Sequence, residues 1–171
     1  TAYDVDRITQ RNIGDPSVIE EAARLVVAEL GDATPLIGFA GAPFTIAAYL
    51  VEGGPSRDHL SARAMMHSDP PAWAKLMEWV ADLDAAFLAA QLRGGARAVQ
   101  LFDSWAGSLS ASDYRASVAP FSQRALASVD PNTPVVHFGV NATHLLSELA
   151  QVAATASRYP VLGVDHRISL N

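Results

Sequence analysis

The feature that most constrains the fold of this chain is an alternation of short apolar runs with longer amphipathic segments. The apolar runs have the length and continuity of strands buried on both faces. The segments between them carry apolar residues at three- and four-residue spacing, which predicts helices. Such alternation predicts parallel β/α units, with helices covering the sheet. The expected strands are residues 35–40, 97–102, 133–138 and 159–164.

The expected helices are bounded by residues that start or stop helices. Gly31 ends a helix over 18–30, and Gly94 ends a long helix over 72–92. Ser110 to Asp113 resembles a capping box before a helix over 114–128, which Pro120 is expected to kink. Three further helices are expected. One covers 45–50, a short one follows a cap at Ser56, and one covers 144–154 after a cap at Thr143.

The number and order of the strands narrow the fold class. A doubly wound sheet alternates in the same way, but its first β–α turn often reads G-x-G-x-x-G. Residues 38–43 do not match that pattern, which argues against a dinucleotide site. Four strands are too few to close a barrel of eight. The expected fold is therefore α/β, with about four β/α units of a partial (β/α)8 TIM barrel.

Composition excludes several classes of function. The net charge of −6 argues against broad electrostatic binding to nucleic acid or to an anionic membrane. The absence of cysteine rules out disulfides, thiolate nucleophiles and cysteine-ligated metals. No apolar stretch is long enough for a transmembrane helix. Residues 1–7 lack the pattern of a signal peptide, and we expect a longer chain around this segment.

The site of a β/α protein lies at the carboxyl ends of its strands, so the residues there are the candidates. After the first strand, small residues over 38–43 would let a ligand approach the backbone. Tyr49, about two turns into the next helix, can donate a hydrogen bond to a carboxylate. The alternative is that these residues only shape a turn and that Tyr49 only packs.

The second strand ends in Asp103 and Ser104. A carboxylate and a hydroxyl directly after an apolar run are costly to bury without a purpose. Ser104 lacks the G-x-S-x-G context of a hydrolase nucleophile, so a hydrogen bond to a ligand is the simpler role. The alternative for Asp103 is a loop cap.

The third strand ends near His137, which can bind metal, relay protons or pack in the core. The five histidines show no H-x-H or H-E-x-x-H spacing, so no metal site is expected. The fourth strand is followed by Asp165, His166 and Arg167. These three residues can serve a site, or the acid and the guanidinium can form a surface salt bridge.

Four segments together resemble the uroporphyrinogen decarboxylase family. They are residues 35–45 with Tyr49 and 51–54, then 100–107, 137–139 and 163–165. The resemblance covers nearly the whole chain. It implies that residues 1–171 are the central part of a single TIM-barrel domain, whose N-terminal and C-terminal barrel segments lie outside them. It also implies a homodimer for the complete enzyme and a cytoplasmic location.

The activity that the resemblance implies is a decarboxylation without cofactor. The four acetate carboxyl groups of uroporphyrinogen III are removed to give coproporphyrinogen III in haem biosynthesis. In the family's proposed chemistry a protonated pyrrole ring of the substrate accepts the electrons, so neither metal nor cofactor is required.

The resemblance assigns substrate binding to Tyr49 and Ser104. Phe39, Gly41, Asp103 and His137 are expected to line the site. The family's arginine-rich segment, central aspartate and late histidine have no counterpart in this sequence. We therefore expect no catalytic residue within residues 1–171, and no activity from this chain alone. The family commonly has tryptophan where His166 stands, which weakens any role for the loop at Asp165.

Two alternatives remain open. Zinc methyltransferases of the same superfamily act on corrinoid or thiol substrates and carry an H-x-C motif at the third strand end. Here that motif reads His137-Phe138-Gly139, without the cysteine. The other alternative is a non-catalytic half-barrel that binds anions or pairs with another chain.

Overall fold

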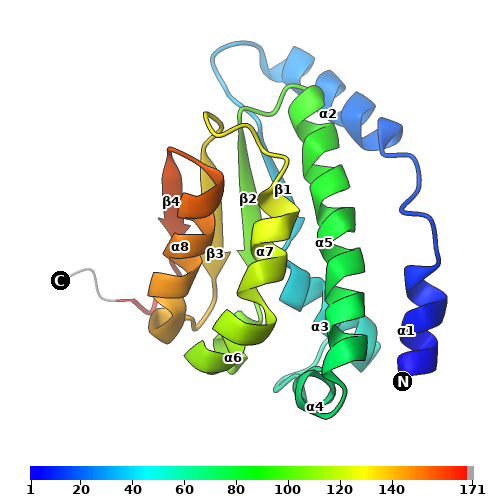
Figure 1. The fold of residues 1–171 in the computed structure, drawn as a ribbon. Coiled ribbons are helices and arrows are strands. Elements are labelled where there is room, and N and C mark those ends of the chain that lie inside the picture. The colour runs from blue at the N-terminus through cyan, green and yellow to red at the C-terminus, as the bar shows by residue number, and fades with distance from the viewer. Residues whose placement is uncertain (169–171) are drawn as a thin grey trace.

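The computed structural model describes residues 1–168 and contains an open sheet of four parallel strands (Figure 1). The strand order is β1-β2-β3-β4, so each strand pairs with its neighbour in the sequence. A doubly wound sheet would reverse direction at a switch point, and this sheet does not. The α/β prediction of about four parallel units is therefore confirmed. The strands are β1 (Ile37–Gly41), β2 (Ala98–Asp103), β3 (Val135–Gly139) and β4 (Pro160–Gly163).

The helices follow the predicted order, with one addition near the N-terminus. The additional helix is α1, which the apolar pattern did not indicate. No helix among residues 1–168 is both long enough and apolar enough to cross a membrane. The helices are α1 (Ala2–Thr9), α2 (Ser17–Leu30), α3 (Pro43–Glu52), α4 (Leu60–Ser68), α5 (Pro70–Arg93), α6 (Ala111–Ser117), α7 (Ala119–Leu126) and α8 (Leu146–Ala156).

Three helix starts differ from the prediction. The helix expected over 114–128 is broken into α6 and α7, because Pro120 lacks an N–H and its ring clashes with the preceding turn. Thr143 opens a short 3₁₀ turn, and α8 begins three residues later. Ser56 does not cap α4. The first N–H groups of α4 donate to the Glu52 carboxylate instead, from Ser61 at 2.8 Å and from Ala62 at 3.1 Å.

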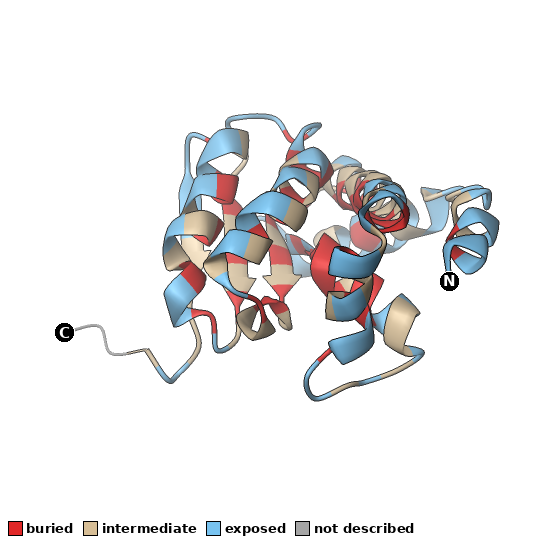
Figure 2. Cartoon of the chain, turned by 60° about the horizontal axis from the view of Figure 1, so that its bottom comes forward, coloured by how far each residue is buried: buried red, intermediate tan, exposed pale blue. Residues whose placement is uncertain are grey.

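One face of the sheet is covered by α5, α7 and α8, and the core lies between them (Figures 1 and 2). Val99 and Leu101 of β2 are buried toward these helices. On the open face, the rings of Phe39, Phe102 and Phe138 form edge-to-face contacts across β1, β2 and β3, with centroid distances of 5.8 and 5.7 Å. A closed barrel would enclose this aromatic row in its interior.

The free edge of β1 is satisfied by a side chain of α5. The N–H of Phe39 donates to Gln91 Oε1 at 2.9 Å, and Gln91 Nε2 donates to the Phe39 carbonyl at 2.9 Å. The carboxamide thus takes the place of a neighbouring strand. Gly38 makes this approach possible, since a Cβ there would lie only 3.1 Å from Gln91 Cβ.

Candidate functional site

A cavity of about 530 Å³ opens at the carboxyl ends of the strands, the edge at which α3, α4 and α6 lie (Figure 1). Three loops form its wall. They contribute residues 56–59 after α3, Ser104, Trp105, Gly107 and Ser108 after β2, and Val140 and Asn141 after β3. The cavity therefore occupies the position at which β/α enzymes bind their ligands.

Of the two residues predicted to bind substrate, Ser104 lines the cavity and Tyr49 contacts its neighbour Trp105. Ser104 is half-buried and lines the cavity. Tyr49 on α3 is 44% exposed, and its ring stacks on Trp105 with centroids 4.0 Å apart and planes at 27°. Because Trp105 directly follows Ser104, this stack couples the positions of both hydroxyl groups.

His59 was not predicted, yet it is the most buried polar residue of the cavity wall. Its ring also stacks on Trp105, at 4.4 Å, and its Nδ1 lies 3.2 Å from Ser108 Oγ. Ser108 donates its only hydroxyl proton to the Trp105 carbonyl at 2.9 Å, so Nδ1 of His59 must be the donor. The Nε2 atom is then an acceptor, and it is buried without a partner. Burial lowers the pKa of His59, which favours the neutral ring.

The charged side chains of the cavity wall lie in the loop after α3. Among the described residues that line it, Arg57 carries the only permanent positive charge, and Asp58 carries the negative charge. The loop of Asn141 is held by Asp165, whose carboxylate accepts from the Asn141 N–H at 3.0 Å. This hydrogen bond is the main reason why the pKa of Asp165 is lowered. Arg167 lies 4.0 Å from Asp165, so the salt bridge considered for this loop forms.

Asp103 and His137 are fully buried on the helix side of the sheet, and neither is among the residues that line the cavity. His137 Nε2 lies 3.5 Å from Asp103 Oδ2. The Tyr114 hydroxyl donates to the same oxygen at 3.1 Å, and the Thr45 hydroxyl donates to Oδ1 at 3.4 Å. Burial is the main reason why the pKa of Tyr114 is raised well above its usual value.

The other two residues expected to line the site lie on β1. Phe39 projects from the open face, where it is 55% exposed. Gly41 ends the strand, and a Cβ there would lie 2.6 Å from the Ile46 side chain, so glycine lets α3 start directly after β1. Within residues 1–168, no group of three or more His, Asp or Glu side chains is placed to hold a metal ion.

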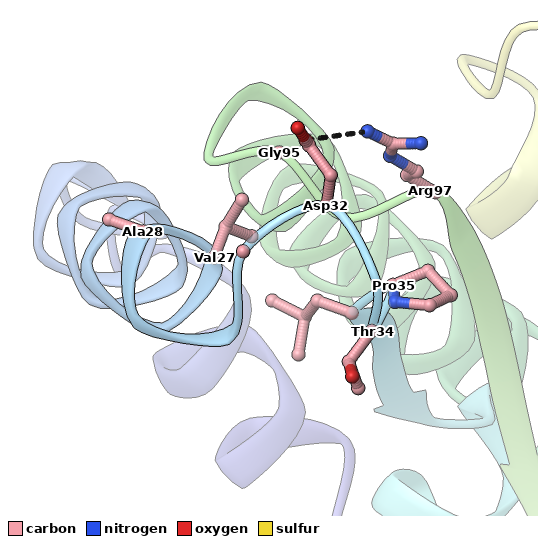
Figure 3. A pocket seen from close by; sticks show the side chains of 9 residues that line it. Val27, Ala28, Asp32, Thr34, Pro35, Gly95 and Arg97 are labelled. Atoms are coloured by element: carbon pink, nitrogen blue, oxygen red, sulfur yellow. Dashed lines mark ion pairs between the residues drawn. The ribbon is translucent and has the colours of Figure 1, made fainter.

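A second cavity, of about 320 Å³, lies at the opposite edge of the sheet (Figure 3). It is bounded by the end of α2 and by the residues that precede β1 and β2. An ion pair between Asp32 and Arg97 crosses it at 3.8 Å, and both side chains are largely exposed. This edge carries the amino ends of the strands, where conserved features of barrels serve stability, so we do not assign it as the site.

Sequential parallel strands with a polar cavity at their carboxyl edge define the β/α-barrel class. The solved structure of a methyltransferase from Methanosarcina mazei shares this fold, with a TM-score of 0.67 over 79% of this chain and 39% of its own. The two sequences are 20% identical, so the likeness shows the fold alone.

The sequence comparisons are more specific. The family model of uroporphyrinogen decarboxylase (URO-D) matches residues 1–171. Proteins named uroporphyrinogen decarboxylase from Leifsonia xyli subsp. xyli and Arthrobacter sp. (strain FB24) are 50% and 52% identical over all of this chain. This chain belongs to the uroporphyrinogen decarboxylase family. It spans about half the length of these curated relatives, 50% and 48% respectively.

Proposed function

We propose that this chain is the central part of a decarboxylase that converts uroporphyrinogen III to coproporphyrinogen III. The observation that carries the proposal is the loop Ser104–Trp105, in which Ser104 lines the polar cavity on the carboxyl edge and Trp105 stacks on Tyr49. Family membership over the whole chain supports the same reaction. The homodimer and the cytoplasmic location implied by the resemblance belong to this proposal as well.

In this proposal the residues of this chain bind and orient the substrate. The hydroxyls of Ser104 and Tyr49 donate hydrogen bonds to its carboxylates, and Arg57 at the rim adds positive charge. The row of Phe39, Phe102 and Phe138 offers an apolar surface to a macrocycle placed over the open face. No catalytic group is assigned to residues 1–171, so the chain alone is expected to be inactive.

The test compares binding and turnover in the whole protein. Uroporphyrin, the oxidised and unreactive form of the substrate, is titrated by fluorescence against Tyr49→Phe and Ser104→Ala. Each variant loses one hydrogen bond to a charged group, about 1.5 to 3 kcal/mol, so the Kd should rise at least tenfold. Coproporphyrinogen formation should fall as well.

The matched control is Tyr159→Phe, which removes an exposed tyrosine hydroxyl at the opposite edge of the sheet. It should leave both binding and turnover unchanged. Unchanged Kd and turnover in both Tyr49→Phe and Ser104→Ala would refute the proposed site. Binding without coproporphyrinogen formation by the wild-type whole protein would refute the decarboxylase assignment and favour an anion-binding role.

A further inference from the structure

We infer that Asp103 is a positioning residue, whose buried carboxylate holds the loop of Ser104 and the helix of Tyr49 in the geometry that binds substrate. This inference rests on the proposed function, because it assumes that Ser104 and Tyr49 contact the ligand. Asp103 itself does not touch the cavity.

The carboxylate joins three elements. Asp103 is the last residue of β2 and directly precedes Ser104. Its Oδ1 accepts from the Thr45 hydroxyl at 3.4 Å, which reaches the first turn of α3. Its Oδ2 accepts from the Tyr114 hydroxyl at 3.1 Å, which reaches α6. Thr45 and Tyr49 are four residues apart and therefore lie on the same side of α3.

Thr45 extends the network to the far side of Ser104. Its Oγ1 accepts from the Trp105 N–H at 3.4 Å, so its own proton is free to point to Asp103. Ser104 is thus held on both flanks, by Asp103 in the strand and by the Trp105 amide. Since Trp105 also stacks on Tyr49 at 4.0 Å, the same network sets the position of the second donor.

Two hydroxyl donors from different helices converge on the buried carboxyl group of Asp103. A fully buried carboxyl group seldom improves stability over an apolar residue of the same size, and geometric specificity is one reason for keeping it. The third neighbour, His137, lies 3.5 Å away and makes no hydrogen bond.

The test measures kcat and KM for uroporphyrinogen in the whole protein with Asp103→Asn and Thr45→Val. Thr45→Val keeps the Asp103 side chain and removes the Thr45 hydroxyl, and Thr45→Ser restores that hydroxyl. Asp82→Asn is the matched control, because Asp82 is a carboxylate on α5 that forms an ion pair with Arg124 of α7. We expect KM to rise about tenfold in Asp103→Asn and Thr45→Val, and to stay unchanged in Asp82→Asn and Thr45→Ser.

Two further measurements separate positioning from a general loss of structure. In the Ser104→Ala background, Asp103→Asn should raise KM less than threefold, since the group that it positions is already gone. Hydrogen exchange at the Trp105 amide, which needs no substrate, should accelerate at least tenfold in Thr45→Val. Full additivity with Ser104→Ala, or unchanged exchange at Trp105, would overturn the inference. A Ser104→Ala variant with normal KM, combined with faster exchange in Thr45→Val, would instead refute the proposed function while leaving the loop network intact.

Discussion

The substitution Asp84→Asn should stabilise the protein, and more so as the pH rises. Asp84 lies on α5, is 4% exposed, and has one carboxyl oxygen without a hydrogen-bond partner. Burial raises its pKa from the ordinary 3.8 to about 8, and the nearby charge of Asp103 adds to the shift. The folded protein therefore carries Asp84 in its neutral, protonated form at pH 7.

The sign follows from proton binding in the two states. Between about pH 4 and pH 8 the folded protein keeps the proton of Asp84, whereas the unfolded chain has released it. Stability from this group is complete below pH 4 and falls as the pH rises toward 8. From pH 5 to pH 8 the interval is three units, which at 1.36 kcal/mol each amounts to about 4 kcal/mol.

Asparagine has nearly the same shape as the neutral acid and does not titrate. The free energy of unfolding should be measured with urea at pH 5 and pH 8 for the wild type and for Asp84→Asn. The advantage of the variant should grow by about 4 kcal/mol between the two values. Asp82→Asn on the same helix is the control, because Asp82 is 45% exposed and its ion pair with Arg124 contributes about 1 kcal/mol or less. An advantage of Asp84→Asn that is the same at both pH values would refute the reasoning.

Two further substitutions test contacts in the fold and the cavity wall. Gln91→Met keeps the side-chain volume but removes both hydrogen bonds to Phe39, so the free energy of unfolding in urea should fall by about 2 kcal/mol. A loss below about 0.5 kcal/mol would contradict the role of the carboxamide at the edge of β1. Gly107→Ala would place a Cβ 2.3 Å from the Val140 carbonyl, so the loop must move and the Kd for uroporphyrin should rise at least tenfold. Gly54→Ala, with no atom within 4 Å of the added Cβ, is its control, and equal Kd values for the two would contradict this prediction.

Local patterns were sufficient for the order of the strands and of the helices after α1. The apolar runs predicted each strand to within two residues at either end, because burial on both faces leaves a signal in a few consecutive residues. The start of α4 was not predictable in the same way. It depends on the Glu52 carboxylate, which lies nine and ten residues before the amides that it accepts from.

The site was predictable only in part, for a similar reason. Ser104 stands directly after β2, where a hydroxyl is conspicuous after an apolar run, and Tyr49 lies about two turns into α3, the helix that follows β1. His59 and Gln91 gave no such signal, because their roles depend on partners far away in the sequence. Gln91 meets Phe39 across 52 positions, and His59 meets Ser108 across 49.

The placement of Asp103 and His137 follows from the alternation of side chains along a strand. Successive residues point to opposite faces, so Asp103 shares the face of Val99 and Leu101, which are buried under the helices. His137 shares the face of Val135 in the same way. The alternation, followed from these buried residues, would therefore have predicted that both side chains lie on the helix side of the sheet and not on its open face. The cost of burying a carboxylate did indicate a purpose for Asp103. Because the alternation turns this side chain toward the helices, we propose that its purpose is to hold Ser104, the first residue beyond the strand, rather than to meet the ligand itself.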